Sequence, residues 1–165
     1  MKRITLLLLA LICFSIGVSG QTKSRQTATA RTQKTETARR HAVQPNGATP
    51  NGLFSPAIVA GELVFTSGQI GVDPKTGQIV EGGITAQTEQ VFRNLTAVLE
   101  AAGSNTEHIL KATVFLADMA DYNTMNELYR KHFKGDPPAR TTVQVAALPR
   151  NARIEIEAIA ITRKD

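Results

Sequence analysis

The chain of 165 residues carries 19 basic and 14 acidic residues, a net charge of +5, and one cysteine, Cys13. Residues 1–20 have a net charge of +2 and residues 21–48 of +5, whereas residues 49–165 hold 11 basic and 13 acidic side chains, a net charge of −2. The C-terminal part therefore lacks the excess of cations on which nucleic-acid binding depends. A single cysteine also excludes an intrachain disulfide.

Residues 1–20 have the composition of a signal peptide. Lys2 and Arg3 precede an almost wholly apolar run, and small residues follow up to Gly20. The apolar run is short for a bilayer span, so we expect cleavage near Gly20 and a secreted or periplasmic protein. Because Cys13 lies in the removed segment, the mature protein would have no cysteine and no thiol chemistry.

Residues 21–48 are expected to form a disordered basic linker. They are rich in Thr, Gln, Ala and Arg, and Val43 is their only large aliphatic residue. Such a segment buries too little apolar surface to offset the entropy lost on ordering. It is either a solvated tether or an arm that touches an anionic surface such as a membrane. Residues 49–165 then form one domain.

The domain begins with a predicted hairpin and a helix. Apolar runs at 57–60 and 63–67 flank a Gly-Glu pair and predict two strands, and residues 73–77 have turn composition. Apolar residues at helical spacing predict a helix over 84–102, which ends at Gly103.

The second half repeats the alternation of strand and helix. Residues 109–117 predict a strand with two largely apolar faces, and residues 119–133 predict a helix. Pro137-Pro138 then forces extended backbone into two last strands. The order β-β-α-β-α-β-β indicates an α+β domain in which two helices cover one face of a sheet. The other face would then need a partner subunit.

The last two strands carry charges that strand propensity does not favour. Arg140, Thr142 and Gln144 share one face of the first strand, and Glu155 and Glu157 share one face of the second. Local conflicts of this kind cluster at functional sites.

These segments resemble the RidA/YjgF family of imine deaminases. The resemblance rests on Pro138-Ala139-Arg140, Ile154-Glu155-Ile156-Glu157-Ala158 and Thr66-Ser67-Gly68-Gln69, and it covers roughly residues 50–163. It implies a chorismate-mutase-like α+β fold, a homotrimer with active sites in clefts between subunits, and an enzyme that uses no cofactor.

The resemblance assigns chemistry first to Arg140 and Glu155. Arg140 matches the residue that grips the substrate carboxylate, a role that suits the planar fork of a guanidinium. Glu155 matches the glutamate that orients the attacking water, and we expect a nearby Arg140 to lower its pKa. Thr142 stands where many members have cysteine, and its backbone carbonyl would help to hold the water.

Four further residues match the binding site of the family. Ser67 and Gly68 match its binding pair after the second strand, where glycine allows close approach of a ligand. Phe54 stands where family members often have tyrosine. Its ring would line the pocket, but it lacks the tyrosine hydroxyl. Asn126 matches a recurrent asparagine on the second helix.

The sequence predicts no metal site, because the three histidines are scattered along the chain and one of them lies in the linker. Asn94-Leu95-Thr96 fits the N-glycosylation pattern but lies on the apolar-striped helix.

We therefore expect hydrolysis of 2-imino or enamine acids, such as 2-iminopropanoate and 2-iminobutanoate, to 2-keto acids and ammonia. Two alternatives remain open at this point. One is a trimer that binds ligands or unfolded chains in the same clefts without catalysis. The other is RNA cleavage, which some relatives are reported to perform and which the acidic balance of the domain disfavours.

Overall fold

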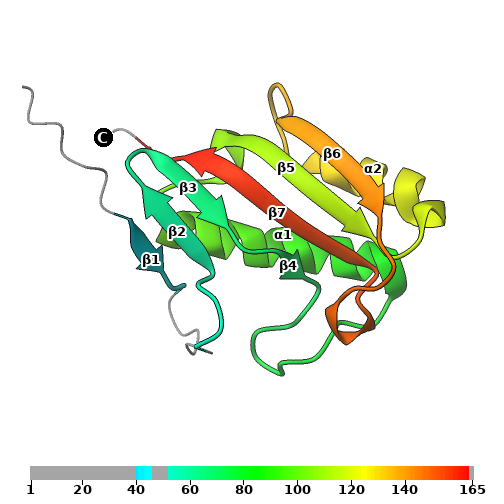
Figure 1. The fold of residues 1–165 in the computed structure, drawn as a ribbon. Helices are drawn as coiled ribbons and strands as arrows, with labels where there is room; N and C mark the ends of the chain where they lie inside the picture. The colour runs from blue at the N-terminus through cyan, green and yellow to red at the C-terminus, as the bar shows by residue number, and fades with distance from the viewer. Residues whose placement is uncertain (1–39, 46–51, 164–165) are drawn as a thin grey trace, which may run out of the picture. The chain divides into compact units, whose positions relative to one another are not determined.

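The computed structural model describes residues 40–45 and 52–163, which form a mixed α+β domain with one sheet and two α-helices (Figure 1). The strands are β1 His41–Val43, β2 Ala57–Ala60, β3 Leu63–Thr66, β4 Gln69–Ile70, β5 Ile109–Leu116, β6 Ala139–Gln144 and β7 Ile154–Ile161. The α-helices are α1 Gly83–Ala101 and α2 Tyr122–Lys131, and short 3-10 turns cover Thr106–His108, Met119–Asp121 and Pro149–Asn151.

Strand β7 lies in the middle of the sheet. The strand order is β1-β2-β3-β7-β5-β6, and the short β4 also pairs with β7. All pairs are antiparallel except β5 with β6, which α2 connects in a strand-helix-strand crossover. The last strand in the sequence therefore joins the N-terminal hairpin to the C-terminal crossover.

Both helices cover the same face of the sheet (Figure 1). Alternate residues of β7 pack under them: Ile154, Ile156, Ala158 and Ala160 are all 4 % exposed or less. Period-two alternation sends the intervening residues of β7 to the opposite face, which the described chain leaves open. Among the described residues, no helix combines the length and apolarity that a membrane span requires.

The open face carries large apolar side chains. Leu63 is paired with Ile161 and Phe65 with Ile159, while Val143 lies on the same face further along the sheet. Leu63, Phe65, Val143 and Ile161 are each 37–41 % exposed. A run of apolar side chains on a sheet face is typical of a surface that associates with another protein.

The sequence predictions of the hairpin, of α1 and of β5 are confirmed within one residue at each end. The predicted helix over 119–133 is wrong at both ends, because residues 119–121 form a 3-10 turn and α2 ends at Lys131. Asp118 explains the start: its carboxylate accepts a hydrogen bond from the Ala120 backbone N–H at 2.9 Å and caps the tighter turn.

Strict alternation along β5 predicts that Leu110 shares one face with Ala112, Val114 and Leu116, and this face needs correction at Leu110. A shift of register between Ile109 and Lys111 turns Ile109 inward, where it is 6 % exposed, and leaves Leu110 47 % exposed. An inserted residue of this kind reverses the alternation locally, and the sequence pattern does not reveal it.

The expected linker boundary at residue 48 is too late, because β1 lies inside the predicted linker. His41, Ala42 and Val43 pair with β2, and Val43 is 9 % exposed within the core. One apolar residue in a basic segment does not predict a strand, but the backbone of β2 offers a free edge for pairing. The signal peptide and residues 21–39 lie outside the described residues.

We expect Val43→Ala to lower the free energy of unfolding by about 1–2 kcal/mol, since two buried methyl groups contribute about 0.8 kcal/mol each. Urea denaturation measures the loss. His41→Ala is the control, because the His41 side chain is exposed on the same strand. Equal stability of both variants and the wild type would mean that β1 is not part of the folded domain.

Candidate active site

Glu155 lies on the open face of the central strand. In register it is opposite Ile70 of β4 on one side and Phe115 of β5 on the other. The side chain is half-buried, whereas Glu157, two residues further on, is exposed. Glu155 is thus flanked by Ile70 and Phe115 on the two neighbouring strands.

Gly68 packs directly against this carboxylate. A Cβ atom at position 68 would overlap the Glu155 carboxyl group, so only glycine fits beside it. Ser67 anchors the same segment: its hydroxyl donates to the Ser55 carbonyl at 2.7 Å, and its backbone N–H donates to the Pro56 carbonyl at 2.9 Å. Phe54 precedes these residues with its side chain 59 % exposed.

Burial raises the pKa of Glu155, and the negative charge of Glu157 raises this pKa further. Within one chain, Arg140 does not contribute the expected lowering of the Glu155 pKa. Arg140 lies opposite Ala112, which faces the helices, so the two side chains project from opposite faces of the sheet. A carboxylate with a raised pKa is a stronger base than an exposed glutamate, which suits it to accept a proton.

Arg140 is held against α2 by an amide and an aromatic ring. Its Nη2 donates to the Asn126 Oδ1 at 2.7 Å, and its Cζ lies 4.5 Å from the centre of the Tyr129 ring. Tyr129 is 4 % exposed, and burial raises the pKa of Tyr129 to about 12 while the Arg140 charge lowers it. The cation-π contact and the hydrogen bond restrict where the guanidinium can point.

Thr142 follows Arg140 on the same face of β6. Its hydroxyl oxygen is buried and has no hydrogen-bond partner within the part of the chain that the structure describes. The predicted site residues thus fall into two groups. Ser67, Gly68 and Glu155 lie together beside β4, while Arg140, Asn126 and Thr142 lie on the helix side of β6.

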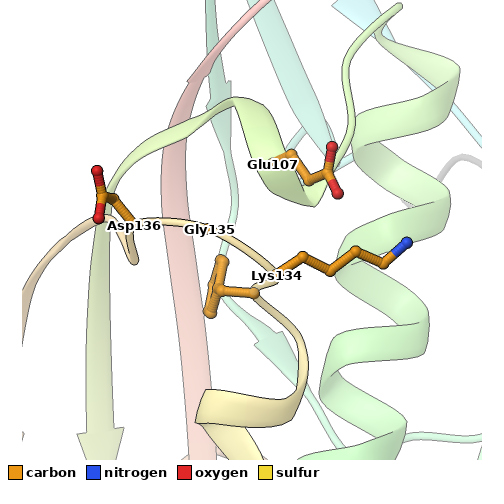
Figure 2. Close-up of a pocket in the computed structure, with 5 residues that line it drawn as sticks. Glu107, Lys134, Gly135 and Asp136 are labelled. Atoms are coloured by element: carbon orange, nitrogen blue, oxygen red, sulfur yellow. The ribbon is translucent and has the colours of Figure 1, made fainter.

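Two surface pockets of the described chain contain none of the predicted site residues. A pocket of about 400 Å³ is lined by Glu107, Phe133, Lys134, Gly135 and Asp136, and Figure 2 shows its charged side chains pointing in different directions. The second lies between α1 and His132. Within residues 40–45 and 52–163, no three His, Cys, Asp or Glu side chains converge to hold a metal ion.

Sequence reasoning missed the residues that support both groups. Tyr129, which underlies Arg140, follows Asn126 by three positions and therefore shares its helix face. Gln87 and Asn94 of α1 bond to backbone beside Glu155. Their spacing, seven residues apart on the apolar face of a helix, could have revealed them, because buried amides require specific partners.

The fold and this arrangement define a single-domain α+β protein with a half-buried glutamate on the open face of its sheet. The family model described as Endoribonuclease L-PSP matches residues 45–162. A human protein named 2-iminobutanoate/2-iminopropanoate deaminase is 47 % identical over 110 residues, which cover 67 % of this chain and 80 % of that protein.

Solved structures agree with this match. RidA from an Antarctic Psychrobacter species has a TM-score of 0.69 and 39 % identity, covering 73 % of this chain and 98 % of that one. TdcF from E. coli with bound serine has a TM-score of 0.68 and 36 % identity, covering 74 % and 99 %. The chain belongs to the RidA/YjgF family.

We expect Glu155→Gln to be more stable than the wild type at pH 7. A raised folded-state pKa means that the folded protein binds the proton more tightly than the unfolded chain. Stability is therefore lost as pH rises from the ordinary glutamate pKa of 4.5 through the folded value. Glutamine has no such dependence, so its advantage in urea midpoint should vanish below pH 4.5.

The matched control is Glu157→Gln at the exposed neighbouring acid. Its effect on the urea midpoint should be smaller than that of Glu155→Gln. A Glu155→Gln variant that is less stable than the wild type at pH 7 would contradict the assigned pKa direction.

Proposed function

We propose that this protein hydrolyses 2-imino acids, and the enamines with which they exchange, to 2-keto acids and ammonia. The observation that carries the proposal is the half-buried Glu155 packed against the backbone of Gly68. The deaminase name of the human relative, which is 47 % identical, supports the same reaction.

The chemistry needs one water and one proton acceptor. Water attacks the carbon of the C=N bond, the imine nitrogen gains a proton, and the resulting carbinolamine expels ammonia to leave the ketone. Glu155 would orient the water and accept its proton, and the same carboxyl group would return a proton to the leaving nitrogen. The raised pKa of Glu155 supports both roles, because it brings the carboxyl group closer to the working pH.

Arg140 would bind the substrate carboxylate. Its Nη2 donates one hydrogen bond to Asn126, its Nη1 lies 4.0 Å from the Met125 sulfur, and the guanidinium contacts the Tyr129 ring, so the N–H groups not used in these contacts would bind the carboxylate. The E. coli relative that was solved with serine supports recognition of an α-carboxylate, since serine carries this group next to its nitrogen-bearing carbon. The orphan hydroxyl of Thr142 lies on the same strand face and would contribute a further contact.

We place the substrate between two subunits of a homotrimer. Glu155 and Arg140 project from opposite faces of one sheet, so one chain alone does not direct both at a single substrate. The exposed apolar residues of the open face supply a surface for association. In this arrangement Ser67, Gly68, Glu155 and the wall formed by Phe54 come from one subunit, and Arg140 comes from its neighbour.

Loss of Arg140 should abolish turnover of freshly generated 2-iminopropanoate while the trimer persists. Arg140→Ala removes one partner of a desolvated charge pair, which lowers the rate by about two to three decades. Arg140→Lys should rescue poorly because lysine lacks the planar fork. Ammonia release measures the rate, and undiminished turnover by Arg140→Ala would exclude the assignment.

A mixture of two inactive variants should recover activity. Arg140→Ala and Glu155→Gln subunits, refolded together in equal amounts, would form hybrid clefts with one intact residue from each chain. Random assembly of trimers makes about one quarter of the clefts intact, so we expect about a quarter of wild-type activity.

Each variant refolded alone is the control and should stay inactive. Light scattering on the same samples reports the mass of the assembly. No recovery from mixed trimers would place both residues in one subunit, and a stable monomer would remove the shared cleft.

RNA cleavage is the rival activity, because the matching family model carries the description Endoribonuclease L-PSP. The net charge of −2 over residues 49–165 argues against it, since affinity for phosphates depends on clustered cations. The exposed Glu157 would add repulsion beside the Glu155 cleft. Imine hydrolysis does not require a cluster of cations. It requires only Arg140, which would bind the substrate carboxylate.

We also propose that the protein is exported, on the basis of the basic start and apolar run of residues 1–20. N-terminal sequencing of the mature protein from its native host should begin near Gln21. A mature chain that still begins at Met1 or Lys2 would contradict export by a cleaved signal peptide.

A further inference from the structure

Helix α1 carries a line of polar side chains on its inner surface. Gln87, Gln90 and Asn94 follow one another at spacings of three and four residues, so they share one helix face. Gln87 is 6 % exposed and Gln90 is 7 % exposed. Burying an amide costs free energy unless its N–H and C=O groups are hydrogen-bonded. The groups that bind these three side chains therefore indicate what the side chains do.

Asn94 binds the backbone that follows β4. Its Nδ2 donates to the carbonyl oxygens of Ile70 at 3.0 Å and Val72 at 2.8 Å. Because carbonyl oxygens only accept, the orientation of the amide is determined, and its Oδ1 accepts from the Gln90 Nε2 at 2.7 Å. The Gln90 Oε1 accepts in turn from the Arg93 Nε and Nη2 at 3.0 and 2.8 Å.

Gln87 binds the backbone at the start of β7. Its Oε1 accepts from the Arg153 backbone N–H at 2.8 Å. The Arg153 side chain makes a two-point contact with Asp121, a carboxylate that is 7 % exposed, at 2.8 and 2.9 Å. Gly71 approaches the helix so closely that a Cβ there would lie 2.9 Å from the Gln87 Cα.

Both amides act on backbone next to Glu155. Asn94 holds Ile70, the residue paired with Glu155 across β4 and β7, and Gln87 holds Arg153, which directly precedes β7 and lies two residues before Glu155. Strand β4 has only two residues and two ladder pairs, so its own hydrogen bonds hold it weakly. The segment that carries Gly68 therefore depends on α1 for its place.

We propose that Asn94 and Gln87 are positioning residues for the Glu155 carboxylate. They hold β4 and the start of β7 at a spacing that keeps Gly68 against Glu155, and they do not touch the substrate. This inference rests on the proposed imine hydrolysis for its activity readout, but the geometry around Glu155 can be measured without any substrate.

The same contacts bear on the glycosylation pattern at Asn94-Leu95-Thr96. A glycan would be attached to the Nδ2 that donates to Ile70 and Val72, so attachment would break the contact with β4. The asparagine of this pattern thus has a structural partner in the folded protein.

The direct test is Asn94→Asp, which keeps the size of the side chain and replaces both N–H donors with oxygen. An aspartate would repel the two carbonyls, release β4 and admit water to Glu155. We expect kcat for 2-iminopropanoate to fall by about tenfold or more, while KM changes by less than about threefold, because water orientation is lost and carboxylate binding is kept. The acid limb of the pH-rate profile should shift to lower pH.

A second readout does not require turnover. The NMR titration of the ¹³C-labelled Glu155 carboxyl group reports its pKa, which should fall toward 4.5 in Asn94→Asp as burial is lost. If the wild type fails to hydrolyse imines, the proposed function is wrong, and this titration still decides whether Asn94 positions Glu155.

Asn123→Asp is the matched control, since it makes the same chemical change at an exposed position of α2 and should alter neither kcat nor the Glu155 titration. Should Asn94→Asp fail to fold, Asn94→Ala and Gln87→Met carry the same comparison without adding charge. Variants that melt at lower temperature but keep wild-type kcat and an unchanged Glu155 pKa would show a purely structural role and overturn the proposal.

Discussion

Period-two alternation, in a sheet that has helices on one face only, decides where each functional side chain lies. In β7 it buries Ile154 and Ile156 under the helices and directs Glu155 to the open face. On β6 the same rule directs Arg140 toward α2. Glu155 and Arg140 therefore lie on opposite faces of the sheet because of their positions in the alternation of each strand. In the mechanism that we propose, an interface between two subunits brings one of each together.

The surroundings of Glu155 disfavour its ionised form. Burial and the neighbouring Glu157 raise the pKa of Glu155, so the folded protein bears a penalty when this group is ionised. Arg150 and Asn151, just before β7, adopt positive φ angles of 57° and 55°, which are strained for residues other than glycine. Arg150 donates a hydrogen bond to the carbonyl of Gly77, which joins this turn to the loop that precedes α1. Backbone strain thus precedes β7, and an unfavourable charge lies within it.

Much of the fold could be predicted because its periodic elements are long. The 19-residue α1 and the eight-residue β5 each repeat apolar residues at the period of their element over most of their length, and that pattern is visible in the sequence. The short β1 and β4 could not be predicted, since two or three residues carry no period and depend on the edges that neighbouring strands offer. Asn126 matched a family position, but its bond to Arg140 emerged only when α2 packed over β6.

The sequence by itself determined the elements that alternate or repeat and the family, because these depend on residue type and local spacing. Its resemblance to the family also singled out Glu155 and Arg140 as candidate site residues. Only the tertiary structure decided their environment. It placed the two residues on opposite faces, raised the pKa of Glu155, and joined Gln87 and Asn94 to the strands beside it. Those properties arise from groups that are far apart along the chain, so no local pattern encodes them.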